Sequence, residues 1–230
     1  MTHDRAVVLL SGGLDSTTVL ALARAAGREV YALSFRYGQR HEVELACARR
    51  QAARHAVAAH EVVDLSHVGA LVASATSLVH GSPLAVPKDS PVGGPEIPST
   101  YVPARNTLFL AYALAWAEAL QAREIWLGVN ALDYSGYPDC RPEFVHAFQA
   151  LADKATRAGV EGHRIHVLTP LLEWTKAQIV AAGLQVGVDY ADTLSCYDPS
   201  EGLACGRCES CQLRRRGFAD AGVADPTRYV

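Results

Sequence analysis

The sequence lacks the features of a membrane protein, of a general polyanion binder and of an exported protein. Nowhere do about 18 apolar residues follow one another, so a membrane-spanning helix is not expected. The 21 Lys and Arg residues nearly balance the 24 Asp and Glu residues, and the formal net charge of -3 gives no general attraction for nucleic acid. Residues 1–5 lack the charged start and apolar continuation of an export signal. We therefore expect a cytoplasmic protein that binds neither membranes nor nucleic acid directly.

Strands and helices alternate at the start of the chain. Residues 5–10 include the continuous apolar run Ala-Val-Val-Leu-Leu, which is typical of a strand buried on both faces of a parallel sheet. The predicted elements are strands at 5–10, 30–35 and 61–65, separated by helices at 16–26 and 41–59. This order predicts an α/β fold with a doubly wound, mostly parallel sheet and helices on both faces.

A proline-rich segment interrupts the regular elements. Six prolines and three glycines lie between Gly81 and Pro103, which predicts a long loop. Beyond it we expect helices at 103–122, 142–158 and 173–182 and strands at 124–130 and 164–169. The composition changes near residue 195. We therefore predict a nucleotide-binding α/β domain with the active site over 1–194, and a small cysteine-rich module with a terminal helix over 195–230.

A glycine-rich turn, Ser-Gly-Gly-Leu-Asp-Ser at residues 11–16, joins the first predicted strand to the first predicted helix. Backbone N–H groups at a tight turn and a helix start form a phosphate site. No lysine follows as in the Gly-x-x-x-x-Gly-Lys-Ser/Thr loop, and the dinucleotide pattern Gly-x-Gly-x-x-Gly is absent here. We predict contacts to ATP from Leu10, Ser11, Gly12, Gly13, Leu14, Asp15, Ser16, Thr17, Thr18, Val19 and Leu20. A simple strand-to-helix turn is the structural alternative.

Asp15 places a carboxylate beside this predicted phosphate site. A carboxylate and a triphosphate repel each other unless a cation lies between them. We therefore predict that Mg²⁺ accompanies ATP and contacts Asp15. Capping of the following helix is the alternative role for this residue.

Four cysteines are closely spaced near the end of the sequence, in the pattern Cys-x8-Cys-x2-Cys-x2-Cys. Thiols stay reduced in the cytoplasm, and four thiolates in a short segment suit tetrahedral Zn²⁺ with no open position. We predict one structural zinc ion per chain, bound by Cys196, Cys205, Cys208 and Cys211, with an iron–sulfur cluster as the alternative. Cys47 is expected in the core. Cys140 is expected to be a bystander thiol near the site, with a nucleophilic role as the alternative.

The turn at residues 11–16 is similar to the pyrophosphate loop of the N-type ATP pyrophosphatases, also called the PP-loop superfamily. Over nearly its whole length the chain resembles the 7-cyano-7-deazaguanine synthase family of the pathway to queuosine. This resemblance rests on residues 11–16, residues 36–41 with Glu44, residues 102–106, residues 135–141 and the four-cysteine module. The family usually has glycine at the position of Ala104. A left-handed backbone there would disfavour alanine, so a slight rearrangement of that loop is expected.

The resemblance implies an adenine nucleotide alpha hydrolase-like fold and an ATP-dependent C–N ligase. It implies that 7-carboxy-7-deazaguanine, a deazapurine carboxylic acid, reacts with ammonia and ATP through an acyl adenylate and an amide to give the nitrile. It also implies a homodimer, and free ammonia is expected because no glutaminase domain is present in these 230 residues. Two other hypotheses remain: another PP-loop adenylating amidotransferase or thiolase, and a non-catalytic nucleotide-binding protein.

This chemistry needs groups that position phosphates and stabilise their charge. Asp15, Arg105 and Lys176 are the predicted catalytic residues, and Arg40 is predicted to bind the nucleotide. Surface ion pairs are the alternative for each of the cations. The basic run at 214–216 is expected to be a solvated helix face or a salt-bridging patch rather than a binding surface.

The substrate implied by the resemblance is flat and has a guanidine-like edge with adjacent N–H donors. A tyrosine ring can stack on such a ligand, and a carboxylate can accept both donors. The predicted substrate-binding residues are Asp133, Tyr134, Tyr137, Asp139 and Arg141. Turn capping is the alternative for the two aspartates.

Overall fold

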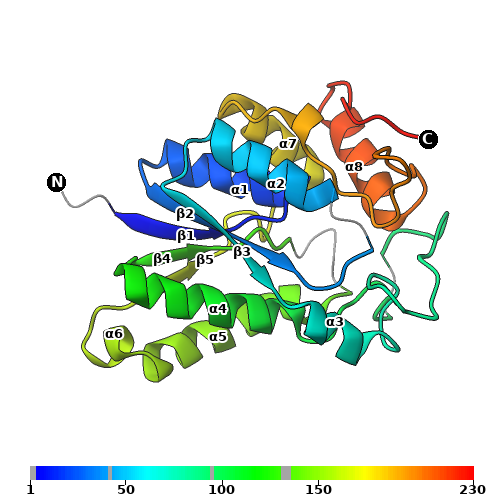
Figure 1. Ribbon diagram of the computed structural model, residues 1–230. Coiled ribbons are helices and arrows are strands. Elements are labelled where there is room, and N and C mark those ends of the chain that lie inside the picture. The colour runs from blue at the N-terminus through cyan, green and yellow to red at the C-terminus, as the bar shows by residue number, and fades with distance from the viewer. Residues whose placement is uncertain (1–3, 41–42, 94–95, 131–135) are drawn as a thin grey trace.

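The computed structural model describes residues 4–40, 43–93, 96–130 and 136–230. Its centre is a sheet of five parallel strands (Figure 1), arranged in the order β3-β2-β1-β4-β5. The strands are β1 (Arg5–Leu9), β2 (Glu29–Arg36), β3 (Ala59–Asp64), β4 (Glu124–Trp126) and β5 (His166–Leu168). The predicted doubly wound α/β fold is therefore confirmed.

Helices cover both faces of the sheet (Figure 1). One face carries α1 (Leu14–Ala25), α2 (Val43–Arg54), α7 (Lys176–Gln185) and α8 (Glu209–Asp220). The other face carries α4 (Arg105–Leu120) and α5 (Pro142–Ala155). Shorter elements are α3 (Ser66–Val72), α6 (Arg157–Val160) and the 3₁₀ turns Pro138–Cys140 and Tyr190–Asp192. None of the helices in the described ranges is long and apolar enough to cross a membrane.

The apolar run of β1 is buried on both faces, as its sequence predicts. Successive side chains of a strand point to opposite faces. Val7 and Leu9 pack in the core under α4 and α5, whereas Ala6 and Val8 pack in the core under α1 and α7. Strand β1 therefore lies in the centre of the sheet. The turn that follows β1 lies in the middle of the edge formed by the carboxyl ends of the strands.

Several elements differ from the sequence-based expectation; for example, the helix predicted at 41–59 ends at Arg54, and β3 begins at Ala59. The strand predicted at 124–130 ends at Trp126, and residues 127–130 follow it and line the pocket described below. The helix predicted from 173 begins at Lys176 because Thr175 and Gln178 form a capping box that fixes its first turn. Helix α3 was not predicted; it begins where the Asp64 carboxylate accepts a hydrogen bond from the Ser66 backbone N–H at 2.9 Å.

The proline-rich segment is a loop in its described residues, 81–93 and 96–103. It packs on the cysteine-rich module, since Val86 and Val102 are buried in one cluster with the cysteine side chains. The Asp89 backbone N–H also donates to the Arg207 carbonyl at 2.9 Å. The loop therefore covers this module and connects it to the start of α4.

Candidate active site

A pocket of about 250 Å³ opens at the carboxyl ends of the strands. Its lining comes from the turns after β1, β2 and β4, from the starts of α2, α4 and α7, and from the segment around the cysteines. The chain leaves β1 toward β2 on one side, whereas β4 lies on the other side of β1. In doubly wound sheets, ligands bind at such a topological switch point.

The glycine-rich turn forms one wall of this pocket. Of the eleven residues predicted to contact ATP, the pocket is lined by Leu10, Ser11, Gly13, Leu14, Asp15 and Ser16. Gly12 has a left-handed φ of +89°, and a Cβ there would lie 2.2 Å from the Glu44 carbonyl oxygen of α2. Glycine at this position therefore allows α2 to pack against the turn.

The remaining predicted ATP contacts lie deeper in α1. The side chains of Thr17, Thr18, Val19 and Leu20 are buried. The Thr18 hydroxyl donates to the Leu14 carbonyl at 2.9 Å and lies 2.7 Å from the Tyr190 hydroxyl. These four residues anchor the helix in the core, and they do not line the pocket.

Serine hydroxyls hold the turn in shape. The hydroxyls of Ser11 and Ser16 are 3.0 Å apart, and Ser16 Oγ also accepts from the Ser11 N–H at 3.1 Å. A further contact crosses the chain: the Leu14 N–H donates to Ser195 Oγ at 3.1 Å, and Ser210 Oγ donates to the Ser195 carbonyl at 2.6 Å. The cysteine-rich segment therefore contacts the glycine-rich turn directly.

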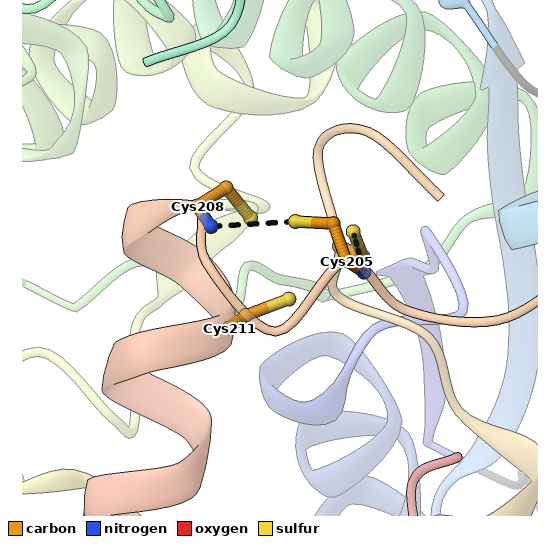
Figure 2. Close-up of side chains that lie close together, drawn as sticks. Cys205, Cys208 and Cys211 are labelled. Carbon is orange, nitrogen blue, oxygen red and sulfur yellow. Dashed lines mark hydrogen bonds between the residues drawn. The ribbon is translucent and has the colours of Figure 1, made fainter. Parts of the chain in front are cut away.

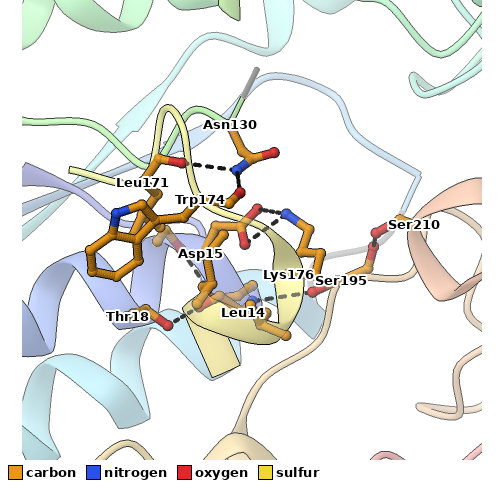
Figure 3. Close-up of polar contacts among 12 residues, drawn as sticks. Leu14, Asp15, Thr18, Asn130, Leu171, Trp174, Lys176, Ser195 and Ser210 are labelled. Carbon is orange, nitrogen blue, oxygen red and sulfur yellow. Dashed lines mark hydrogen bonds and ion pairs between the residues drawn. The ribbon is translucent and has the colours of Figure 1, made fainter. Parts of the chain in front are cut away.

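Asp15 and Lys176 form an ion pair in the pocket (Figure 3). Lys176 Nζ donates to both carboxylate oxygens of Asp15, at 2.9 and 2.7 Å, although 161 residues separate them. The lysine side chain is 10 % exposed and the aspartate side chain 29 %. The Asp15 side chain makes no capping hydrogen bond to α1, whose N-cap is Gly13. Two of the predicted catalytic residues thus meet beside the glycine-rich turn.

Asn130 stabilises the turn that precedes Lys176. Its side-chain amide donates to the Leu171 carbonyl at 2.8 Å and to the Trp174 carbonyl (Figure 3). These carbonyls belong to the turn between β5 and α7. The turn after β4 therefore fixes the approach of α7 to the pocket.

Arg105 is the first residue of α4 and lines the pocket. Its guanidinium lies over the Tyr37 ring, 5.9 Å from the ring centre. Burial alone would lower the pKa of Arg105, but Tyr37, Tyr137 and Asp139 raise it above its usual value. The guanidinium is therefore a permanent positive charge in the pocket.

Ala104, the residue before α4, has φ 54° and ψ 23°. Alanine thus adopts the left-handed conformation that glycine favours, at a cost of about 1 to 2 kcal/mol. The Tyr101 hydroxyl compensates in part, since it accepts the Ala104 N–H at 3.1 Å. This backbone leads directly into Arg105 and its contact with Tyr37.

Glu44 lies in the first turn of α2 and also lines the pocket. Burial raises the pKa of its carboxyl group to about 7, and the charge of Arg105 only partly opposes this shift. A raised carboxyl pKa inside a cleft is typical of functional sites. Tyr37 lines the same pocket, and burial, with a smaller contribution from Glu44, raises the pKa of its hydroxyl although Arg105 opposes this shift.

The predicted substrate-binding residues occupy different places. Tyr137 lines the pocket, and its hydroxyl lies 2.7 Å from Thr100 Oγ1 and 3.3 Å from the Tyr197 hydroxyl. Asp139 is buried, and its carboxylate accepts the Asn106 backbone N–H at 2.9 Å, so it caps the start of α4. Asp139 therefore does not line the pocket.

Other predicted residues lie outside the pocket or outside the described part of the chain. Arg141 is exposed at the start of α5. Arg40 donates from Nη2 to the Leu84 carbonyl at 2.7 Å, and it does not line the pocket. Asp133 and Tyr134 lie outside the described residues.

Several pocket residues were not singled out from the sequence. Ser195, Ser210 and Tyr197 flank the cysteines and carry no pattern of their own. Arg214 lines the pocket and is 3 % exposed; its Nε lies 3.1 Å from Asp225 Oδ1. The salt-bridging interpretation of the basic run therefore holds for Arg214, whereas the solvated-face interpretation is wrong for it.

Cys140 also lines the pocket, but it is a weak nucleophile. Its side chain is 7 % exposed, and burial with the nearby Asp139 charge raises the pKa of the thiol to about 12. The thiolate is the reactive form of cysteine. At neutral pH this thiol is protonated, which agrees with the bystander role predicted for it.

The four predicted metal ligands converge. The sulfur atoms of Cys196, Cys205, Cys208 and Cys211 all lie within 4.8 Å of one another. Figure 2 shows three of them facing a common centre between α8 and the preceding turn. Backbone N–H groups point at the sulfurs, for example from Cys205 to Cys196 Sγ at 3.2 Å and from Cys208 to Cys205 Sγ at 3.3 Å. Such N–H groups stabilise thiolates, so the cluster can hold a metal ion such as zinc.

Comparison with solved structures defines the class of fold. NMN synthetase from Francisella tularensis has a TM-score of 0.53 at 17 % identity, over 97 % of this chain and 79 % of that one. A 4-thiouridine synthetase–RNA complex with bound ATP has a TM-score of 0.51 at 18 % identity, over 95 % of this chain and 51 % of that one. The chain therefore shares the fold of these two synthetases.

Within this class the sequence identifies the family. The family model described as queuosine biosynthesis protein QueC matches residues 5–222, and the chain belongs to this family. The 7-cyano-7-deazaguanine synthase of Saccharophagus degradans is 56 % identical over 233 residues, covering 100 % of both chains. The enzyme of that name from Geobacter metallireducens is 58 % identical over 230 residues, covering 99 % of this chain and 94 % of that one. The resemblance drawn from the sequence is confirmed.

Proposed function

We propose that this protein is an ATP-dependent ligase that converts 7-carboxy-7-deazaguanine and ammonia to 7-cyano-7-deazaguanine in queuosine and deazapurine biosynthesis. The observation that carries the proposal is the full-length match, at 56 % and 58 % identity, to proteins named for this synthase. The pocket supports it, because a phosphate-binding turn and a group of aromatic side chains line the same cavity. Nucleotide and flat substrate can therefore meet in one site.

The proposed reaction uses two activations. A carboxylate oxygen attacks the α-phosphorus of ATP, pyrophosphate leaves, and ammonia then displaces AMP from the acyl adenylate to give the amide. The amide oxygen attacks a second ATP in the same way. Loss of this AMP together with two protons leaves the carbon–nitrogen triple bond. Each nitrile thus consumes two ATP and releases two AMP and two pyrophosphate molecules.

The protein's own groups position phosphates and balance their charge. We propose that the N–H groups of residues 10–16 hold the triphosphate, and that Lys176 and Arg105 stabilise the charge that develops on it. Lys176 is hydrogen-bonded to both carboxylate oxygens of Asp15. For Mg²⁺ to bind Asp15 when it arrives with ATP, the Lys176 ammonium group would have to leave the carboxylate and move toward the phosphates. Mg²⁺ would neutralise phosphate charge and orient the leaving pyrophosphate.

The proposal also covers the metal ion, the oligomeric state and the source of nitrogen of this protein. We propose that the cysteine cluster holds one structural Zn²⁺, because four converging sulfurs leave no open coordination position. The protein is proposed to be a cytoplasmic homodimer that uses free ammonia. Tyr137 is proposed to contact the deazapurine, since its ring lines the pocket.

The test incubates purified protein with ATP, Mg²⁺, ammonium and 7-carboxy-7-deazaguanine, and follows product mass, AMP and pyrophosphate. The nitrile with both nucleotide products is expected. AMP without nitrile would contradict the substrate assignment, and the absence of AMP would contradict adenylation altogether. Lys176→Ala should abolish AMP formation, whereas Lys154→Ala, an exposed lysine of α5, is the matched control and should not.

A further inference from the structure

Glu44 lines the same pocket as the glycine-rich turn, but its side chain has no part in the proposed phosphate contacts. It projects from the first turn of α2, and Tyr37 and Arg105 reach the same space from the end of β2 and the start of α4. Of the charged groups, Arg105 is the one that acts on the ionisation of Glu44. The pocket is therefore lined by a second acidic residue and a second cation besides Asp15 and Lys176.

Aromatic rings line the same pocket as Glu44 and Arg105. Phe35 and Phe109 are stacked with ring centres 4.0 Å apart, and the Tyr37 ring lies 5.7 Å from Phe109. Tyr137 and Tyr197 line the same cavity. Rings of this kind bind the faces of a flat heterocycle, and the polar groups at their margin determine which edge of it is accepted.

Glu44 has unused hydrogen-bonding capacity. Two acidic residues line the pocket in the described part of the chain, Asp15 and Glu44, and Asp15 is bound to Lys176. Asp139 is occupied by the backbone N–H of Asn106. No donor among the described residues lies within hydrogen-bonding distance of the Glu44 carboxylate, which is nevertheless half-buried. A desolvated carboxylate without donors is costly, so a ligand that supplies them binds with a large gain.

We propose that Glu44 is the residue that determines substrate specificity, by accepting hydrogen bonds from two adjacent N–H groups on the guanidine-like edge of the substrate. This inference rests on the proposed function. The ring N–H and the exocyclic amino group of a 2-amino-4-oxopyrimidine ring match the two oxygens of one carboxylate. Arg105, whose guanidinium lies over the Tyr37 ring, would then face the oxygen-bearing part of the ligand. We therefore assign to Glu44 the substrate contact that was expected from the sequence for Asp139, because the Asp139 carboxylate caps α4.

The experiment compares two substrates in three proteins. The substrates are 7-carboxy-7-deazaguanine and its analogue with hydrogen in place of the 2-amino group; the proteins are wild type, Glu44→Gln and Glu143→Gln. Glu143 is a matched control, because it is an exposed glutamate in the first turn of α5. The readout is kcat/KM for AMP release with each substrate, together with the KM for ATP.

Wild type and Glu143→Gln should prefer the 2-amino substrate. In Glu44→Gln we expect this preference to fall by about tenfold to a hundredfold, because a hydrogen bond to a charged group is lost only with the 2-amino substrate. The KM for ATP should stay unchanged. Glu44→Asp, which keeps the charge but shortens its reach, should give a smaller loss and replaces Glu44→Gln if that variant does not fold.

Equal losses with both substrates, or a raised KM for ATP with an unchanged preference, would overturn the assignment of Glu44. These outcomes are separate from failure of the proposed function. If wild type forms no nitrile from the 2-amino substrate, the proposed function fails and the inference falls with it. If wild type forms the nitrile and Glu44→Gln keeps the full preference, the inference alone is wrong.

Discussion

Replacing Asp225 with asparagine should strongly destabilise the protein. The Arg214 and Asp225 side chains are only 3 % and 10 % exposed, and Arg214 Nε lies 3.1 Å from Asp225 Oδ1. Arg214 also donates to Thr193 Oγ1 at 2.8 Å and to the Tyr190 carbonyl at 3.0 Å. Asparagine keeps the size of the side chain but removes its charge, so the guanidinium stays buried without a counter-charge.

The size of this effect follows from the burial of the pair. Removing one partner of a buried ion pair costs about 3 to 5 kcal/mol. Because Arg214 keeps its bonds to Thr193 and Tyr190, we expect the lower end, about 3 kcal/mol. In a protein of this length each kcal/mol lowers Tm by about 2 to 4 °C, so Tm should fall by about 6 to 12 °C. Urea unfolding and calorimetry of the metal-loaded protein measure both quantities.

The control is an exposed ion pair of the same chemistry. Arg157 and Glu161 lie 2.6 Å apart with 83 % and 47 % of their side chains exposed. Glu161→Gln should therefore change the free energy of unfolding by less than about 1 kcal/mol. If Asp225→Asn were no more damaging than Glu161→Gln, burial would not determine the strength of the Arg214 contact and the reasoning would be refuted.

Three further predictions concern the turn, the second acidic residue and the cysteines. Gly12→Ala should lower the free energy of unfolding by about 2 to 5 kcal/mol and weaken ATP binding, because φ is +89° and the new Cβ would meet the Glu44 carbonyl. An unfolding curve equal to that of wild type would contradict this. The raised pKa of Glu44, about 7 against a usual 4.5, means that the folded protein holds this proton more tightly than the unfolded chain. The free energy of unfolding should therefore fall as pH rises from about 4.5 to 7, by at most about 3 kcal/mol because water in the pocket screens the charge. Glu44→Gln should remove this pH dependence. If the free energies of unfolding of wild type and Glu44→Gln differed by the same amount at every pH, the prediction would be wrong. Chelation of the metal should lower Tm and weaken ATP binding, since Ser195 next to Cys196 holds the Leu14 N–H; equal ATP affinity with and without metal would argue against this coupling.

Local sequence patterns were sufficient for the sheet and for the position of the glycine-rich turn. The apolar run of β1 is buried on both faces because it is central, and the turn after it has one backbone requirement, at Gly12, that few other residues meet. The cysteine cluster was equally predictable, since its ligands lie within one short segment. These features depend on neighbours in the chain.

The convergence of distant residues could not be predicted in the same way. Arg214 looked like part of a solvated basic run, yet Asp225 and the packing of α8 on α7 bury it. Asp139 looked like a ligand-binding carboxylate, yet it caps α4 across 33 residues. Glu44 lay in a segment quoted for the family resemblance, but only the fold places it beside Arg105. Capping and ion pairing use the same side chains as ligand binding, and tertiary contacts decide between them.

The central claim is that one pocket transfers AMP twice to oxygens of the same substrate group, first to a carboxylate oxygen and then to the amide oxygen. The most direct measurement uses substrate with both carboxylate oxygens labelled with ¹⁸O, followed by mass analysis of AMP and nitrile. The account predicts two AMP per nitrile, each carrying one ¹⁸O atom, because every AMP leaves with a former substrate oxygen. Unlabelled AMP would mean that ATP is hydrolysed by water instead, and would contradict adenylation of the substrate.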